Sequence, residues 1–154
     1  MSVLFLNSYG VSYVHGISLN NFTGTLPSEL GNLAKLGQLY FDSSGFSGPF
    51  PSTFSKLKNL KTLWAADNDF IGKMPDFIGS LTKLQDLRFQ GNFFQGPIPA
   101  SLSNLTNLTS LQIGDCNFDI TLRMTCIFVV MHERSPILLE VGNHKKFLWW
   151  PELM

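Results

Sequence analysis

The sequence predicts an α/β solenoid, in which each turn of the chain forms one coil and successive coils stack on one another. Three kinds of residue recur at intervals of 24 positions. The columns are Gly24, Gly48, Gly72 and Gly96; Pro27, Pro51, Pro75 and Pro99; and Leu39, Leu63, Leu87 and Leu111. No insertion or deletion interrupts a column, and an unbroken period of this size is the sequence signature of a stacked repeat.

Each coil is expected to contribute one strand to a parallel sheet. Within residues 84–92, the alternation of Leu87 and Phe89 predicts a short strand with one face inward and residues 86, 88 and 90 facing solvent. The spacing L-x-x-L-x-L-x-x-N identifies a leucine-rich repeat. Because a coil cannot bury its own apolar edge, the coils must stack. We expect a right-handed solenoid with the parallel sheet on its concave face.

The opposite, convex side of each coil is expected to carry a short 3₁₀ or helical turn. Leu102, Leu105 and Leu108 lie three positions apart, as such a turn requires. The repeated glycine turns the chain. The repeated proline stiffens an extended segment that does not need its own N–H group.

Two further columns predict internal contacts between coils. The first is a structural ladder of small, mainly polar residues: Asn20, Ser44, Asn68, Asn92 and Cys116. We expect these side chains to point inward and bond the backbone of the turn in the next coil, whose amides would otherwise be unsatisfied. The second is an aromatic column, expected to form one continuous inner stack: Phe22, Phe46, Phe70, Phe94 and Phe118.

Composition and charge exclude several functions. Lys plus Arg and Asp plus Glu are both 11, giving a formal net charge of zero, which argues against nucleic-acid binding and against a polybasic membrane-surface protein. No apolar run approaches the roughly 18–20 residues that span a bilayer. The N-terminus is not a convincing signal peptide, because it lacks a basic region and its apolar run is only Val3–Leu6.

No catalytic or metal-binding constellation is visible, and no cofactor is expected. His15, His132 and His144 are far apart in sequence and lack a Cys, Asp or Ser partner at a meaningful spacing. A protein kinase requires a Gly-rich loop, a paired lysine, H-R-D and D-F-G, whereas this chain has only His132-Glu-Arg134. The chain is therefore predicted not to be an enzyme.

The outward strand positions are the expected partner-binding surface. The predicted contact residues are Tyr40, Asp42, Trp64, Arg88, Gln90 and Gln112. Strands lie about 4.8 Å apart, so Trp64 and Arg88 should be adjacent and could stack. Tyr, Trp and Arg dominate binding hot spots. The alternative is that Tyr40 and Trp64 merely pack on each other or against further N-terminal coils.

Three N-x-[ST] sequences are candidate glycosylation sites, at Asn21, Asn104 and Asn107. Each is expected on an exposed turn or on the convex side, which would leave the strand positions clear. Glycosylation requires secretion. The alternative is that N-L-T is a by-product of the repeat phrase S-N-L-T-N-L.

Four short phrases, each followed by a longer one, resemble the plant-type leucine-rich repeat. They are GTLP, GPFP, GKMP and GPIP, followed by SELGNL, STFSKL, DFIGSL and ASLSNL. The chain is similar, over about residues 17–119, to the ectodomains of plant receptor-like serine/threonine kinases, in particular the group that joins such repeats to a malectin-like domain. The resemblance implies a second short sheet, an extracellular location, and a protein or peptide ligand with a co-receptor as a further partner. Such families also have a signal peptide, a cysteine-paired cap and a kinase, so we expect a truncated fragment. The alternatives are a secreted inhibitor of the polygalacturonase-inhibiting type and a gene-model product without independent function.

We expect three segments: an incomplete N-terminal coil at 1–16, the repeats at 17–119, and an irregular tail at 120–154. The period ends where Ile120 and Arg123 stand at the glycine and proline positions. The tail is either a translated intron or a true C-terminal cap over the last coil. Cys116 and Cys126 could pair, or Cys126 could remain a free thiol.

Overall fold

The computed structural model describes residues 18–19, 21–96 and 98–113, and the backbone alone of the strands at 14–16, 128–130, 137–141 and 144–148. The ladder positions Asn20 and Cys116, and Phe118, Cys126 and His132, have no described side chain. The expected segment boundaries at residue 17 and at residues 119–120 lie outside the described residues.

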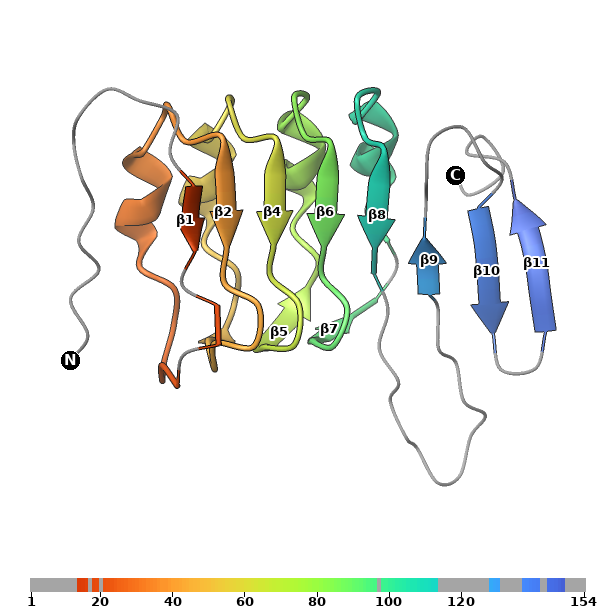
Figure 1. The fold of residues 1–154 in the computed structure, drawn as a ribbon, viewed down its shortest axis with the longest axis horizontal. Coiled ribbons are helices and arrows are strands. Elements are labelled where there is room, and N and C mark those ends of the chain that lie inside the picture. Colours follow the sequence, from red (N-terminus) through yellow and green to blue (C-terminus); the bar gives the residue numbers. More distant parts are fainter. Residues whose placement is uncertain are drawn as a thin grey trace.

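The main sheet has five parallel strands in the order β1-β2-β4-β6-β8 (Figure 1). Their bounds are β1 Val14–Gly16, β2 Gln38–Tyr40, β4 Thr62–Trp64, β6 Asp86–Arg88 and β8 Ser110–Gln112. Leu39 pairs with Leu63, Leu63 with Leu87, and Leu87 with Leu111. Residues 24 positions apart therefore occupy equivalent places in adjoining strands, and the predicted solenoid with a parallel sheet is confirmed.

A second, smaller parallel sheet has the order β3-β5-β7, as the resemblance implied. Its strands are β3 Ser47–Gly48, β5 Asp69–Lys73 and β7 Phe93–Gln95. Two members of the glycine column lie in these strands, Gly48 and Gly72, with φ angles of 81° and 86°. Because side chains with a Cβ avoid this left-handed region, the column needs glycine for its backbone conformation.

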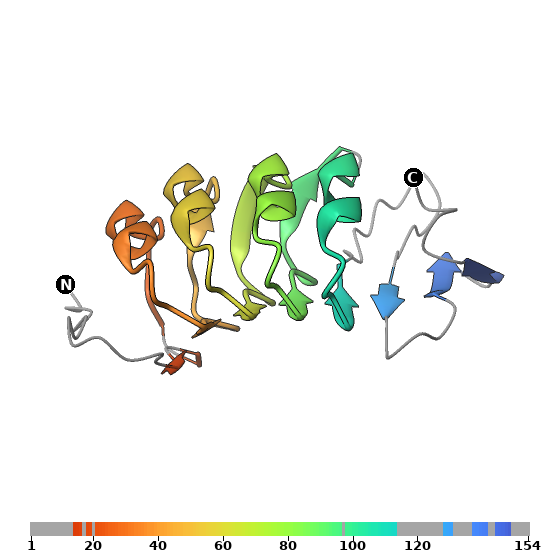
Figure 2. The ribbon, with the colours of Figure 1, turned by 90° about the horizontal axis from the view of Figure 1, so that it is seen from above.

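Four 3₁₀ helices line the side of the solenoid opposite the main sheet (Figure 2). Their bounds are η1 Ser28–Asn32, η2 Ser52–Lys56, η3 Asp76–Ser80 and η4 Ala100–Asn104. Each follows a proline of the repeat in extended conformation; Pro51, for example, has φ −65° and ψ 126°. The proline column thus ends the extended segment and leads into the helix.

Neighbouring coils are packed more tightly at two junctions than the period alone predicts. A Cβ added to Gly31 would clash with the backbone and side chain of Thr53, and one added to Gly79 would clash in the same way with Ser101. Thr53 Oγ1 donates to the Ser28 carbonyl over 2.6 Å, and Ser101 Oγ donates to the Asp76 carbonyl over 2.7 Å. At the η2–η3 junction, Ser55 stands in the glycine position.

We expect Gly79→Ala to lower the free energy of unfolding by about 1–3 kcal/mol, because the added methyl group must push η3 away from the rigid backbone of η4. The measurement is urea denaturation followed by circular dichroism. Ser55→Ala, at the equivalent position of the preceding coil, is the matched control and should change the free energy by less than about 0.5 kcal/mol. Equal stability of the Gly79→Ala variant and the wild type would contradict the tight junction.

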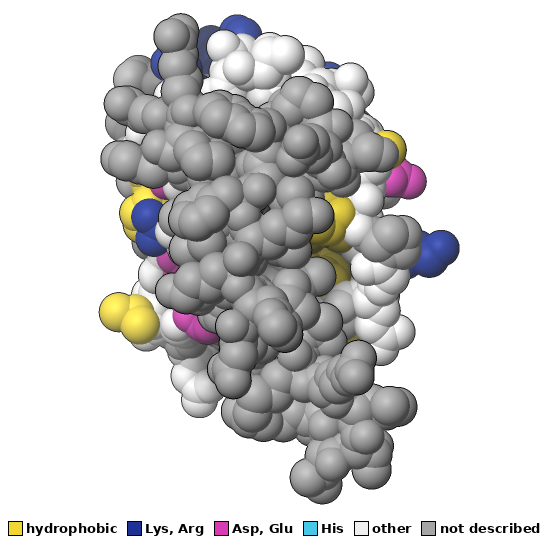
Figure 3. Space-filling model, turned by 90° about the vertical axis from the view of Figure 1, so that its right-hand side faces the viewer, with side chains coloured by type: hydrophobic (Ala, Val, Ile, Leu, Met, Phe, Trp, Pro, Cys, Tyr) yellow, Lys and Arg dark blue, Asp and Glu magenta, His cyan; other side chains and the backbone are white. Residues whose placement is uncertain are grey.

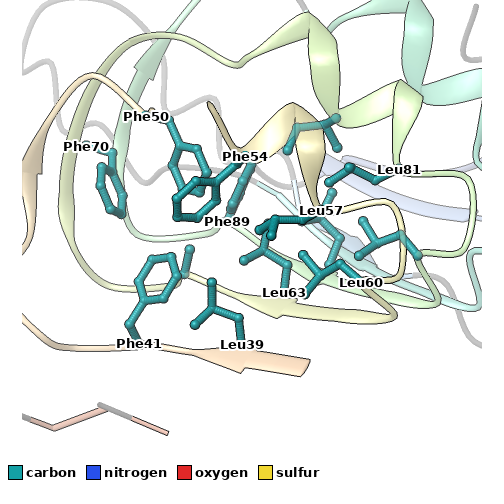
Figure 4. Packing of buried hydrophobic residues seen from close by; sticks show 14 of the residues in the cluster. Leu39, Phe41, Phe50, Phe54, Leu57, Leu60, Leu63, Phe70, Leu81 and Phe89 are labelled. Atoms are coloured by element: carbon teal, nitrogen blue, oxygen red, sulfur yellow. The ribbon is translucent and has the colours of Figure 1, made fainter. Parts of the chain in front are cut away.

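The core is a cluster of leucines and phenylalanines between the sheets and the helices (Figure 4). The aromatic column does not form the single stack expected from the sequence. Phe22 stacks on Phe46 at 5.2 Å and Phe70 on Phe94 at 6.2 Å between ring centroids. Between Phe46 and Phe70, however, the contacts run through Phe41, which meets both rings at 5.9 Å and 6.0 Å.

Phe50, a position that the sequence did not single out, connects this aromatic cluster. Its ring lies 5.1 Å from Phe54, 5.1 Å from Phe70 and 5.2 Å from Phe89. Phe50 is 8% exposed. The core is therefore held together by rings from different columns, which a search for identical residues at one interval cannot find.

The Asn ladder bonds in the direction opposite to the one expected. Asn68 Oδ1 accepts from the amides of Ser44 and Phe46 in the preceding coil, and Asn68 Nδ2 donates to the Phe41 carbonyl of that coil. Asn92 repeats the arrangement, since its Nδ2 donates to Ala65 of the coil before it. The expectation that these side chains bond the next coil was therefore wrong. They reach back because the preceding turn presents the unpaired amides.

The segment expected to be irregular contains three strands, β9 Phe128–Val130, β10 Ile137–Val141 and β11 His144–Leu148. They form an antiparallel sheet in the order β11-β10-β9, separate from the main sheet. Figure 1 shows β9 beside β8, the last strand of the main sheet. The description of this segment as wholly irregular was wrong, because the pairing of antiparallel strands does not depend on the 24-residue period.

Candidate recognition surface on the main sheet

The outward side of the main sheet, here called the strand face, carries the predicted contact residues. We define it by the described side chains of Gln38, Tyr40, Asp42, Thr62, Trp64, Ala66, Asp86, Arg88, Gln90, Ser110 and Gln112. Strands β2, β6 and β8 follow the expected alternation, with a buried residue between two half-buried ones. Thr62 and Ala66 occupy the positions equivalent to residues 86 and 90, which were expected to face solvent, but both are buried. Short side chains between longer neighbours leave little surface accessible.

Trp64 is flanked on both sides along the strand face. Arg88 places its Cζ 3.6 Å from the centroid of the Trp64 ring, so the expected stacking of these two side chains is present. On the other neighbouring strand, the Tyr40 ring meets Trp64 edge to face, with centroids 4.7 Å apart and an interplanar angle of 77°. The alternative packing of Tyr40 on Trp64 is therefore also present. One face of the indole is covered by a guanidinium group and is not open to a ligand.

The Arg88 guanidinium also forms an ion pair with a second side chain. Its Nε lies 3.7 Å from Asp86 Oδ1, and the two side chains are 30% and 22% exposed. This distance is an ion pair but too long for a hydrogen bond. Stacking on Trp64 and attraction to Asp86 together fix the guanidinium over the centre of the strand face.

Four buried polar atoms of the strand face have no hydrogen-bond partner: Trp64 Nε1, Asp86 Oδ1, Arg88 Nε and Gln90 Oε1. They belong to the adjacent strands β4 and β6 and to the residue that follows β6 closely in the chain. Among the described residues, no other buried side-chain nitrogen or oxygen lacks a partner. Buried polar groups are nearly always paired in folded proteins, so this concentration sets the strand face apart from the rest of the described surface.

The remaining predicted contact residues form some of their hydrogen bonds within the protein. Gln90 Nε2 donates to Gln112 Oε1 over 3.0 Å, which joins the outward residues of two neighbouring coils. Asp42 Oδ1 accepts from the Ala66 amide over 2.7 Å. The structure thus brings all six predicted contact residues onto one continuous face. Asp86, which was expected to face solvent but was not among the predicted contact residues, lies beside Arg88 on this face. The opposite charges of these two side chains, two positions apart in the sequence, were the available signal.

Burial raises the pKa of Asp42 above its ordinary value of 3.8, and the charges of Asp67 and Asp86 act in the same direction. The hydrogen bond from the Ala66 amide and the charge of Arg88 oppose this rise. Because the net pKa is raised, the folded state holds the Asp42 proton more tightly than the unfolded state does.

This shift predicts a pH dependence of stability. The contribution of Asp42 is fully present below its ordinary pKa and is lost as the pH rises through the raised value. Asp42→Asn keeps an oxygen to accept from the Ala66 amide but cannot ionise. We therefore expect the variant to gain stability relative to the wild type between pH 3 and pH 7, measured by urea denaturation at each pH. A difference that stays constant with pH would contradict the raised pKa.

The three candidate glycosylation residues, Asn21, Asn104 and Asn107, are exposed and do not lie on the strand face. Asn104 is the last residue of η4. Asn107 Nδ2 donates to the Thr82 carbonyl over 2.8 Å, which ties it to the preceding coil.

No group of three or more His, Cys, Asp or Glu side chains that could hold a metal ion occurs among the described residues. The part of the chain that the structure describes also contains no helix long and apolar enough to cross a membrane. In the end view of Figure 3, the Lys and Arg side chains and the Asp and Glu side chains are scattered around the rim rather than gathered by sign.

Comparison with known proteins shows which class of repeat protein this chain resembles. The Leucine Rich Repeat family model matches residues 59–81 and 83–105. The chain is 48% identical over 48 residues to Receptor-like protein 39 of Arabidopsis thaliana, a match that covers 30% of this chain and 5% of that protein. The chain therefore contains leucine-rich repeats and is similar to plant leucine-rich-repeat receptors, but it spans a small fraction of that relative's length.

Solved structures agree on the fold. The structure of the Arabidopsis receptor kinase HAESA in complex with the peptide hormone IDA and the co-receptor SERK1 matches with a TM-score of 0.61 and 38% identity, covering 64% of this chain and 17% of that one. A plant ice-binding protein matches with a TM-score of 0.58 and 36% identity, covering 60% and 30%. Since one fold serves such different ligands, the function must be argued from the strand face itself.

Proposed function

We propose that the strand face is the peptide-recognition surface of a plant leucine-rich-repeat receptor ectodomain. The observation that carries this proposal is the group of four buried polar atoms without a hydrogen-bond partner around the stacked Trp64 and Arg88 side chains, two of which form the Arg88–Asp86 ion pair. A buried polar group without a partner costs about 1–3 kcal/mol. A ligand that supplies donors and acceptors, as a peptide main chain does at every residue, would recover part of that cost on binding.

The shape of the surface and the relatives support the same function. Strands held by a backbone ladder and a packed core lose little freedom on binding, which favours affinity for a flexible ligand. The receptor kinase HAESA was solved in complex with the peptide hormone IDA and the co-receptor SERK1. By analogy, we propose an extracellular location, a peptide ligand and a co-receptor as the second partner.

The test is selection of a displayed library of random nine-residue peptides against the whole chain. Synthetic copies of the selected peptides are then measured by calorimetry against the wild type, Trp64→Ala and Arg88→Ala. We expect both variants to weaken binding by about tenfold or more, as hot-spot residues do. Lys35→Ala, exposed and outside the strand face, is the control. Equal affinity of the wild type, Trp64→Ala and Arg88→Ala would remove the strand face from consideration.

The finer assignment is to receptor-like kinases that join such repeats to a malectin-like domain. It is supported by the resemblance of the run of repeats at residues 39–115 to that group. The measurement is sequencing of the genomic region and transcripts downstream of codon 119. A reading frame that encodes malectin-like and kinase domains would establish the assignment, and a frame that encodes neither would remove it.

A further inference from the structure

The strand face, together with the neighbouring turn that contains Asp67, carries a net negative charge, although the chain as a whole has a formal net charge of zero. The charged side chains here, among the described residues, are Asp42, Asp67, Asp86 and Arg88, and the charges of the last three act on the ionisation of Asp42. This part of the surface therefore holds three carboxylates and one guanidinium. This local excess of negative charge contrasts with the other charged side chains of the described residues, which are the six lysines Lys35, Lys56, Lys58, Lys61, Lys73 and Lys83 and the three acids Glu29, Asp69 and Asp76.

The single positive charge is already engaged within the protein. Arg88 lies over the Trp64 ring at 3.6 Å and beside Asp86 at 3.7 Å. Arg88 therefore cannot serve a ligand anion without giving up part of these contacts, and an incoming carboxylate would also meet the repulsion of Asp42 and Asp86. The geometry disfavours an acidic ligand at this position.

Several hydrogen-bond acceptors on the strand face, by contrast, lack a hydrogen-bond donor. Asp86 Oδ1 and Gln90 Oε1 are buried without a hydrogen-bond partner. Asp42 receives one hydrogen bond, from the Ala66 amide, through its Oδ1. Lysine and arginine side chains carry three and five N–H donors and no acceptor, so a basic side chain would satisfy these oxygens and offset the excess charge at once.

Resting on the function proposed above, we infer that the strand face selects basic peptides, with a ligand Lys or Arg side chain held near Asp42 and Asp86. Opposite charges that meet across an interface increase the selectivity of binding and the rate of association. Their effect should weaken as salt is added, since charges separated by more than about 10 Å are screened at 0.1 M.

The test uses three matched sets of synthetic nine-residue peptides, identical except that the same three positions carry Lys, Gln or Glu. Fluorescence anisotropy with the whole chain measures their affinities at low salt and at physiological salt. We expect the Lys set to bind at least about tenfold more tightly than the Gln set, with the preference reduced by salt. The double variant Asp42→Asn, Asp86→Asn should lose that preference, while the control Glu29→Gln, Asp69→Asn should keep it.

The outcomes separate this inference from the proposed function. Binding of the Gln or Glu set that equals or exceeds binding of the Lys set, and is lost in Trp64→Ala, would overturn the charge preference and leave recognition by the strand face intact. A Lys preference that the double variant retains would overturn the roles of Asp42 and Asp86. Failure of every set to bind the wild type would overturn both the inference and the proposed function.

Discussion

Asn68→Ala lowers the free energy of unfolding by about 3–5 kcal/mol, because it leaves several buried backbone groups without partners at once. The Asn68 side chain is 4% exposed. It accepts from the amides of Ser44 and Phe46 and donates to the carbonyls of Phe41 and Ala66. Alanine offers none of these bonds, and the backbone groups that it leaves behind are buried.

The measurement is urea denaturation, with the slope of the transition checked against the wild type. Asn59→Ala, in the same coil, is the matched control. Asn59 is exposed, donates to the Ala34 carbonyl and accepts from Lys83, so its loss should cost less than about 1 kcal/mol. A similar loss in both variants would show that burial of the ladder does not determine its contribution.

Phe50→Ala is expected to lower the free energy of unfolding by about 3–5 kcal/mol, the range for a large aromatic side chain removed from a core. Phe50 contacts rings from four different columns, among them Phe54, Phe70 and Phe89. Its removal leaves a cavity that a rigid stack of coils cannot close.

The control for Phe50 comes from the repeat itself. Met74 stands at the equivalent position of the next coil, and Phe50→Met should therefore cost less than about 1.5 kcal/mol, because the side chain is flexible and of similar volume. Thermal denaturation of the two variants gives the comparison. If Phe50→Ala were no less stable than Phe50→Met, Phe50 would not be the centre of the aromatic cluster.

Much of the fold could be predicted because each column of the repeat does the same task in every coil. The alternation around Leu87 is a strand in all coils, and the glycine and proline columns mark the second sheet and the start of each 3₁₀ helix. The predictions failed where residues of different columns meet. Phe41 replaces the direct contact between Phe46 and Phe70, and Asn68 bonds the coil before it rather than the one after it.

The sequence predicted which residues lie on the strand face, but it did not predict all the contacts that they make there. The 24-residue spacing was enough to place Trp64 beside Arg88. It could not reveal that Asp86 lies beside the Arg88 guanidinium, that Tyr40 meets Trp64 edge to face, or that Gln90 pairs with Gln112. These contacts depend on side-chain rotamers and on burial, which are properties of several coils together.

The sequence by itself determined the architecture of this protein, because a coil that repeats every 24 residues can bury its apolar edge only against a copy of itself. The tertiary structure alone decided which junctions are tight, which rings connect the core, and which polar atoms on the strand face are left without partners. The physical reason is that a repeated column specifies a position in each coil, whereas contact, desolvation and charge balance arise between unlike residues of neighbouring coils.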